Sequence, residues 1–324
     1  MTGLPPNILL LLGGFGALYF GAEWRVRGAA RIASTMGISP VVVGLTLVSL
    51  GTSAPELVVC IIATTGGQGS LLIGNVLGSN LANIGLILGA TALVTPLDVA
   101  DRVITREVPI MILMTIIVYP LVLDLNVTRG EGGILLFLLA VYIAFTFSTE
   151  EDQVQDILDE VGGLTHEVPE EAQGKVNLKD VGLVVVGAVT LAVGGRAIVT
   201  GATFLAEAFG ASELVIGLTV VALGTSLPEL VTSLVAAMRK HADIAVGNIV
   251  GSNIFNLTAV LGGAATVREF TIQESALSQE LPAVLALSVL VWPILTTARK
   301  VRRWEGAVLL ISYFALALLI TFSA

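Results

Sequence analysis

One stretch of this chain repeats itself without a gap, and the repeat restricts the possible folds more than any other feature. A shift of 173 residues places GISPVVVGLTLVSLGTSAPELVV (37–59) on GASELVIGLTVVALGTSLPELVT (210–232). The same shift places GNVLGSNLANIGLILG (74–89) on GNIVGSNIFNLTAVLG (247–262). The shared residues are Gly, Pro, Ser, Thr, Asn and Glu as well as apolar residues, so low complexity does not explain the match. The chain therefore consists of two related halves.

Apolar runs of membrane-spanning length recur from one end of the chain to the other. Hydrophobic residues make up 55% of the sequence and charged residues only 13%, whereas a soluble protein has roughly 25% charged residues. These runs predict an all-α polytopic membrane protein. The ten expected transmembrane helices cover 7–23, 38–64, 70–94, 107–124, 131–148, 178–195, 211–237, 243–266, 280–298 and 305–322.

The number of spans predicts how the two halves are arranged. Five spans in each half is an odd number, so the second half enters the membrane from the opposite side and the halves are inverted-topology repeats. The expected parts are a first five-helix repeat at 1–148, an acidic cytoplasmic linker at 149–177 and a second five-helix repeat at 178–324.

The distribution of basic residues predicts the orientation. If both termini lie outside, all 16 Lys and Arg residues except Arg129, Arg196 and Arg268 lie on the cytoplasmic side. The opposite orientation would reverse this bias and violate the positive-inside rule. We therefore expect the N- and C-termini outside.

The heptads GTSAPEL (51–57) and GTSLPEL (224–230) each place an acid inside an apolar span. The proline interrupts helical hydrogen bonding, and the neighbouring hydroxyls can satisfy the distorted backbone. An ionised side chain at the bilayer centre costs about 2.5–3.5 kcal/mol and marks a functional site by default. Apart from Lys179, at the very start of the span 178–195, no Lys or Arg lies inside a predicted span, so we expect no ion pair at this depth. The candidate oxygen donors are Ser49, Thr52, Ser53 and Glu56 in the first half, and Ala222 (through its carbonyl), Thr225, Ser226 and Glu229 in the second.

The second repeated motif supplies neutral oxygens. Ser79 and Asn83 are four residues apart, as are Ser252 and Asn256, so each pair shares one helix face. Carboxylate, hydroxyl, amide and carbonyl oxygens are hard ligands that suit Na⁺ and Ca²⁺. We therefore predict one shared midplane site with two glutamates. The flanking glycines, which permit close helix packing, are Gly74, Gly78, Gly247 and Gly251. Four further amides serve either in packing or in support of the ligands, namely Asn75, Asn80, Asn248 and Asn253.

These paired motifs resemble the α-repeats of the sodium/calcium exchanger family, within the cation/calcium antiporter superfamily. The resemblance covers the whole chain and is closest to the short prokaryotic type, because the linker at 149–177 has no room for a calcium-sensing domain. It implies a multi-pass antiporter of a prokaryotic cell (inner) membrane that exchanges Na⁺ for Ca²⁺ by alternating access. It also implies no cofactor, no enzyme activity, no nucleic acid and no obligatory protein partner; the substrates are Ca²⁺ and Na⁺, and the surroundings are the lipid bilayer.

Matched motif by motif, the resemblance implies a set of ion ligands. They fall on Thr52, Ser53, Glu56, Ser79, Asn83, Thr225, Ser226, Glu229, Ser252 and Asn256. The carbonyls of Ser49 and Ala222 complete the outer sodium positions. One residue departs from the pattern, because several family members carry Asp where this chain has Asn256. Potassium-dependent members rely on an acid there, so Asn in both halves argues against K⁺ dependence.

Three other functions stay open as alternatives. The first is an H⁺/Ca²⁺ (or other divalent cation) antiporter that uses the same glutamates, although neither His166 nor His241 lies near a repeated motif. The second is a passive cation channel. The third is an intramembrane enzyme, which is disfavoured because no His or Cys lies beside the polar motifs.

Overall fold

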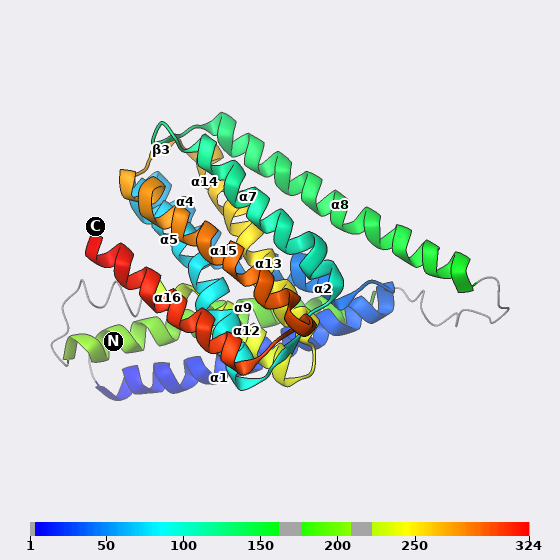
Figure 1. Cartoon of the computed structure of the whole chain (residues 1–324). Coiled ribbons are helices and arrows are strands. Elements are labelled where there is room, and N and C mark those ends of the chain that lie inside the picture. The colour runs from blue at the N-terminus through cyan, green and yellow to red at the C-terminus, as the bar shows by residue number, and fades with distance from the viewer. Residues whose placement is uncertain (1–3, 162–175, 209–221, 324) are drawn as a thin grey trace.

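Apolar helices of membrane-spanning length make up most of the protein. The computed structural model describes residues 4–161, 176–208 and 222–323 (Figure 1). Within these ranges, eight helices are long and apolar enough to cross a membrane, or nine if the bent pair Pro40–Thr52 and Ala54–Thr65 forms one span. The fold is therefore that of a polytopic helical membrane protein. Residues 211–221 of the expected span at 211–237 lie outside the described residues, and the rest of that span contains two short helices.

The elements follow the two halves of the sequence. The first half contains α1 (Leu4–Met36), α2 (Pro40–Val43), η1 (Gly44–Val48), α3 (Ser49–Thr52), α4 (Ala54–Thr65), α5 (Gly69–Leu81), η2 (Ala82–Ile87), α6 (Leu88–Val94), β1 (Leu97–Asp98), η3 (Val103–Glu107), α7 (Val108–Leu121), β2 (Asn126–Val127) and α8 (Arg129–Val161). The second contains α9 (Leu178–Ala208), α11 (Ala222–Thr225), α12 (Leu227–Met238), α13 (Ala242–Phe255), η6 (Asn256–Val260), α14 (Leu261–Val267), β3 (Phe270–Thr271), η7 (Ala276–Glu280), α15 (Leu281–Thr296), η8 (Thr297–Arg299), β4 (Lys300–Val301) and α16 (Arg303–Ser323).

Several long helices are interrupted by a π-helical turn. η3 and η7 occupy positions related by the 173-residue shift, and η2 and η6 nearly so. η2 begins one residue before Asn83, and η6 begins at Asn256. A π turn widens the helix locally and often marks a functional site. Two of the predicted ligands therefore lie in distorted rather than regular helix.

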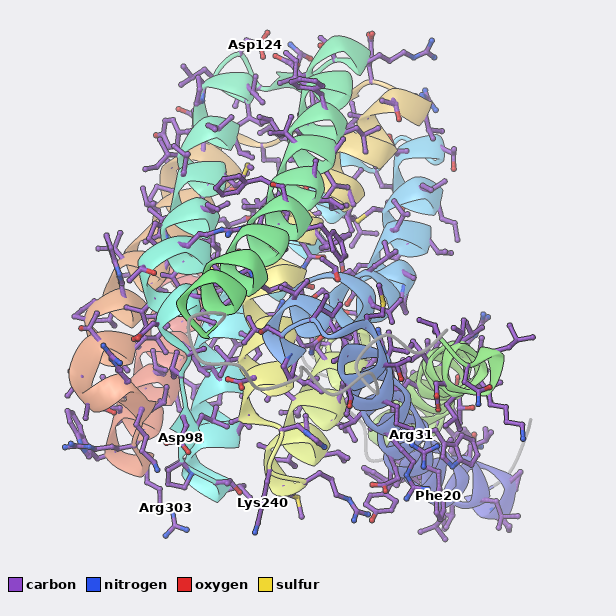
Figure 2. All side chains as sticks on the ribbon, turned by 90° about the vertical axis from the view of Figure 1, so that its right-hand side faces the viewer. Phe20, Arg31, Asp98, Asp124, Lys240 and Arg303 are labelled. Atoms are coloured by element: carbon purple, nitrogen blue, oxygen red, sulfur yellow. The ribbon has the colours of Figure 1, made fainter. Side chains whose placement is uncertain are left out.

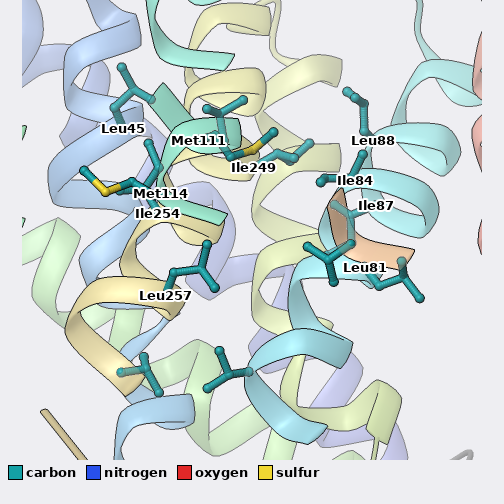
Figure 3. Packing of buried hydrophobic residues seen from close by; sticks show 14 of the residues in the cluster. Leu45, Leu81, Ile84, Ile87, Leu88, Met111, Met114, Ile249, Ile254 and Leu257 are labelled. Carbon is teal, nitrogen blue, oxygen red and sulfur yellow. The ribbon is translucent and has the colours of Figure 1, made fainter. Parts of the chain in front are cut away.

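The centre of the bundle is formed by α5 and α13, the helices that carry the repeated sequence GSN at 78–80 and 251–253. These two stretches are called the GSN motifs. In the most apolar window of Ala242–Val267, 94% of the residues are buried, compared with 17% for Arg303–Thr321 at the periphery. Apolar side chains such as Leu81 and Ile84 of the first half and Ile249 of the second surround this centre (Figure 3). The polar motifs are thus enclosed by tightly packed apolar residues.

Helices α1 and α9 pack antiparallel along one edge of the bundle (Figure 1). Each helix has a glycine at every seventh position on the contacting face, namely Gly14, Gly21 and Gly28 on α1 and Gly187, Gly194 and Gly201 on α9. A Cβ atom on Gly21 would lie 2.9 Å from the carbonyl oxygen of Gly187, and one on Gly187 would lie 2.6 Å from that of Gly21. Absence of side chains lets the two backbones touch.

Two short antiparallel sheets each pair one strand of the first half with one strand of the second half. β1 pairs with β4, with Leu97 opposite Val301, and β2 pairs with β3, with Val127 opposite Phe270. Asp98 of β1 and Asp124, just before β2, lie at opposite ends of the bundle (Figure 2). Each end of the molecule is therefore closed by a contact between the first and second halves.

The length of α1 corrects the expected position of Arg25. The span expected at 7–23 is part of a continuous 33-residue helix that ends at Met36. Arg25, expected at a cytoplasmic helix end, lies inside this helix and is completely buried. The prediction that no Arg lies inside a span was therefore wrong, because Arg25 falls within the candidate span Pro5–Met36.

The region expected to be a linker starts as a helix. α8 continues through Val161, so it includes the first residues of 149–177. Residues 162–175 lie outside the described part of the chain.

The contact between α1 and α9 predicts unequal effects of two Gly→Ala substitutions. Both substitutions increase intrinsic helix propensity, but only Gly21→Ala places a methyl group against backbone atoms, because Gly16 has no neighbour within 4 Å of a Cβ. We expect Gly21→Ala to be less stable than Gly16→Ala by about 1–3 kcal/mol, the usual cost of overpacking. Thermal unfolding of both variants in detergent measures the difference, and equal midpoints would contradict the predicted contact.

Candidate functional site

Both heptads break their helix at the second hydroxyl residue. Ser53 (φ −80°, ψ 0°) separates α3 from α4, at a bend of 41°, and Ser226 (φ −88°, ψ 0°) separates α11 from α12. The motif proline then occupies the first turn of the next helix, where its missing N–H removes no helical hydrogen bond. Glu56 and Glu229 follow in the same turns, where the helix dipole favours an acid. The two acids are 1% and 2% exposed.

The carboxylates of Glu56 and Glu229 lie close enough to repel one another. One oxygen of each, Oε2, has no hydrogen-bond partner among the described residues. Like charges buried together without hydrogen-bond partners are costly. A cation bound between them would offset this cost, so the pair favours a cation site.

Thr52 connects the two halves beside this acid pair. Its hydroxyl oxygen lies 3.1 Å from Oδ1 of Asn248 and 3.2 Å from the hydroxyl oxygen of Ser252, and it also hydrogen-bonds to Glu229. The Ser49 hydroxyl donates to the backbone carbonyl of Asn248 at 3.1 Å. Residues of the first heptad therefore bind directly to the GSN helix of the second half.

Some amide side chains hydrogen-bond to and position their neighbours, whereas others have an oxygen that accepts no hydrogen bond. Asn256 donates through Nδ2 to Oδ1 of Asn80 at 3.0 Å, and Asn80 donates to the backbone carbonyl of Asn253 at 3.2 Å. Oδ1 of Asn256 and both amide atoms of Asn83 are buried and have no partner within the described ranges. Asn80 thus orients Asn256, and the amide oxygens of Asn83 and Asn256 accept no hydrogen bond from the described residues.

Asn75 and Asn248 lie one helical turn before Ser79 and Ser252, and they make corresponding contacts in the two halves. Asn248 donates through Nδ2 to the Ser233 hydroxyl at 3.0 Å, and Asn75 donates to Sγ of Cys60 at 3.4 Å. The 173-residue shift places Cys60 on Ser233. Cys60 is therefore a buried packing residue that accepts a weak hydrogen bond.

Glycine brings the second GSN helix against residues 41–49, the segment just before the first heptad. A Cβ atom on Gly251 would lie 2.5 Å from the carbonyl oxygen of Leu45, and one on Gly247 would lie 2.7 Å from that of Val41. This confirms the predicted close approach for α13. For Gly74 and Gly78, no described residue lies within 4 Å of a Cβ; the segment that corresponds to 41–45 in the second half, 214–218, is not described.

The structure buries the side chains of most predicted site residues. The buried side chains are Ser49, Thr52, Ser53, Glu56, Ser79, Asn83, Ser226, Glu229, Ser252 and Asn256. Thr225 is partly exposed, and Ala222 is the first residue of α11. In the described parts of the chain, no three His, Cys, Asp or Glu side chains lie together as a metal cluster. The ligand chemistry is therefore that of two carboxylates and several neutral oxygens, which suits hard cations.

Sequence reasoning missed Arg25 as a neighbour of this region. Its Nη2 donates to the backbone carbonyl of Val48 and lies 3.4 Å from that of Leu47. The guanidinium also interacts electrostatically with Glu229. One signal was available, because the seven-residue glycine spacing of α1 continues to Gly28, beyond the expected end of the span.

A helical membrane bundle with two buried acids among uncommitted neutral oxygens defines a cation transporter. Comparison with known proteins identifies which kind. The family model described as "Sodium/calcium exchanger protein" matches residues 6–148 and 179–322, so the chain belongs to the sodium/calcium exchanger family. The protein is thus an antiporter rather than an enzyme at the level of its family.

Individual relatives agree with this assignment along nearly the whole chain. The putative antiporter CaxA of Alkalimonas amylolytica is 37% identical, over 94% of this chain and 95% of that protein. The sodium/calcium exchanger MaX1 of Methanosarcina acetivorans is 31% identical, over 95% and 97%. The solved structure of the sodium-calcium exchanger NCX_Mj soaked with 10 mM Na⁺ and zero Ca²⁺ has a TM-score of 0.82 and 28% identity, over 97% of this chain and 98% of that one.

The hydrogen bonds of Thr52 predict a loss of stability on removal of its hydroxyl. Thr52→Val preserves the shape but leaves Asn248 and Ser252 without this partner, which costs about 1–3 kcal/mol for a buried polar group. Thr65→Val is the matched control, because the exposed Thr65 hydroxyl contacts only carbonyls of its own helix, those of Ile61 and Ile62. We expect a lower unfolding midpoint for Thr52→Val alone, measured in buffer without Na⁺ or Ca²⁺. Equal midpoints for the two variants would show that the contacts between the halves contribute nothing.

Proposed function

We propose that this chain exchanges Na⁺ for Ca²⁺ across a cell membrane by alternating access at the buried site around Glu56 and Glu229. One observation carries the proposal, namely that two buried acids from different halves repel one another and each retain an oxygen without a hydrogen bond. The similarity to MaX1 and NCX_Mj supports the choice of ions.

Competition for the same oxygens couples the two fluxes. Two carboxylates carry two negative charges, which one Ca²⁺ or a few Na⁺ can neutralise, so both kinds of ion cannot occupy the site together. The proposed ligands are the side chains of Thr52, Ser53, Glu56, Ser79, Asn83, Thr225, Ser226, Glu229, Ser252 and Asn256, with the carbonyls of Ser49 and Ala222. Hydroxyl and amide oxygens without hydrogen bonds, such as those of Ser53 and Asn83, support this set.

The halves at 1–148 and 178–324 are proposed as inverted repeats of five spans, joined by the linker at 149–177. Support comes from contacts that recur in pairs. A Cβ on Gly89 would lie 2.8 Å from the carbonyl oxygen of Gly306, and one on Gly132 would lie 2.8 Å from that of Gly262. Gly89 and Gly262 are related by the 173-residue shift, and each contacts the last helix of the other half.

The proposed orientation places both termini outside and the basic end of the bundle in the cytoplasm. Lys240 and Arg303 lie at one end, together with Asp98, and Asp124 lies at the other (Figure 2). Large apolar side chains on the outer helices, such as Phe137 and Ile311, are 66% and 69% exposed. Such side chains suit contact with lipid, in an inner membrane if the cell is a Gram-negative bacterium.

The central test is uptake of radiolabelled Ca²⁺ into sodium-loaded liposomes that contain the purified protein. We expect uptake only when sodium is higher inside than outside. Glu56→Gln and Glu229→Gln should each reduce uptake to the level of empty liposomes, because one carboxylate cannot balance Ca²⁺. Glu274→Gln, which removes an exposed acid, should transport normally. Full activity of either site variant would contradict the assignment of the site.

The same liposomes distinguish the alternatives. Uptake that follows a pH gradient without sodium would identify an H⁺/Ca²⁺ antiporter that uses these glutamates. Flux that never accumulates Ca²⁺ against its gradient would identify a passive channel.

Asn256 predicts transport without K⁺ dependence. Replacement by Asp adds a third carboxylate beside Asn80, where the amide now donates a hydrogen bond. We expect sodium-driven uptake by the wild-type protein to be the same in K⁺ and in choline, and uptake by Asn256→Asp to respond to K⁺. Asn83→Asp, at the corresponding position of the first half, tests whether the added charge acts on one side only. Dependence of the wild-type protein on K⁺ would refute the interpretation of Asn256.

A further inference from the structure

Arg25 places a permanent positive charge beside the proposed site, where the apolar composition of the spans predicts none. We propose that Arg25 is a specificity-determining residue. Its positive charge weakens the binding of one Ca²⁺ more than the binding of one Na⁺. The inference rests on the proposed site at Glu229, and it concerns affinity and ion preference rather than the exchange itself.

The guanidinium is held next to the first heptad by backbone carbonyls. Arg25 projects from α1 and donates through Nη2 to the carbonyl of Val48, whose oxygen also lies 3.3 Å from the Thr52 hydroxyl. Gly51 provides the room, because a Cβ atom there would lie 2.6 Å from Nη2. The carbonyl that binds Arg25 thus belongs to Val48, the residue before Ser49 and one helical turn before Thr52. Ser49 and Thr52 are two of the proposed ligands.

The charge of Arg25 is not cancelled by a direct partner. Arg25 is completely buried, and its Nε and Nη1 have no hydrogen-bond partner among the described residues. Its hydrogen bonds go to neutral carbonyls, and it interacts with Glu229 through space. A buried charge in surroundings of low dielectric acts over several ångströms with little screening. A cation at the acid pair is therefore attracted by two carboxylates and repelled by one guanidinium.

Only one half of the protein carries this charge. The 173-residue shift places Ile198 on Arg25 and Gly224 on Gly51. A Cβ atom on Gly224 would meet the side chain of Val199, an apolar group. The glycine of the heptad thus accommodates a guanidinium in the first half and an isopropyl group in the second. A role in packing alone would be served by an apolar side chain in both places.

Coulomb's law predicts which ion is more affected. At equal distance, a divalent ion is repelled by the guanidinium twice as strongly as a monovalent ion. Arg25 therefore lowers the affinity for one Ca²⁺ more than the affinity for one Na⁺. Removal of the charge should tighten Ca²⁺ binding, and the logarithm of the change for one Na⁺ should be about half as large.

Equilibrium binding of radiolabelled Ca²⁺ and Na⁺ to the purified full-length protein tests the proposal. Arg25→Gln is the main variant, because it keeps a polar side chain with an N–H donor but carries no charge. Arg25→Ile introduces the residue of the second half, and Arg25→Lys preserves the charge. Arg27→Gln is the matched control, since the Arg27 side chain is 55% exposed and pairs with Glu23.

We expect Arg25→Gln and Arg25→Ile to bind Ca²⁺ about tenfold more tightly and each Na⁺ about threefold more tightly, as two charges compare with one. Arg25→Lys and Arg27→Gln should stay within about twofold of the wild-type protein. Unchanged or weaker Ca²⁺ binding by folded Arg25→Gln would overturn the proposal, as would an Arg25→Lys variant that behaves like Arg25→Gln. A failed site assignment looks different, because Glu56→Gln and Glu229→Gln would then still bind Ca²⁺.

Discussion

The repulsion between Glu56 and Glu229 is the constraint on which the rest of the structure depends. Two carboxylates buried close together in a low-dielectric interior are unstable unless a cation or hydrogen-bond donors compensate them. The described residues leave one oxygen of each without a donor, and the buried guanidinium of Arg25 acts on Glu229 only through space, because its hydrogen bonds go to backbone carbonyls. In the proposed function, the free energy that opposes burial of the acids favours the binding of a cation between them. A fold that satisfied both acids internally would be more stable and could not transport.

This requirement explains the irregular backbone at the centre of an otherwise regular helical bundle. The heptads break at Ser53 and Ser226, and the π turns η2 and η6 begin next to or at the motif asparagines. Non-helical backbone at membrane depth is tolerated where it is enclosed by protein. The tight glycine contacts of α13 provide that enclosure, since they bring its backbone against Leu45. Distortion and close packing are thus two parts of one arrangement.

The repeated residues of this site could be predicted from the sequence, because a chance match of that length is improbable and an acid at membrane depth needs a function. The contacts that join the halves could not. Thr52 binds Asn248, and Asn80 binds Asn256, but a repeat shows which residues correspond and not which residues touch. The position of Arg25 was missed for another reason. Hydropathy ends a span at the first charges, whereas the glycine contacts with α9 extend α1 well beyond them.

The differences between the halves matter as much as their likeness. Identical inverted halves would give inward- and outward-facing states of equal energy, since a two-fold rotation about an axis in the membrane plane would convert one state into the other. A residue that breaks the correspondence near the site removes this equality. Arg25 and Ile198 form such a pair, because one carries a buried charge and the other does not, and the charge acts on Glu229. In the proposed mechanism the repeat therefore provides the ability to alternate, and Arg25 is proposed to bias which ion the site favours.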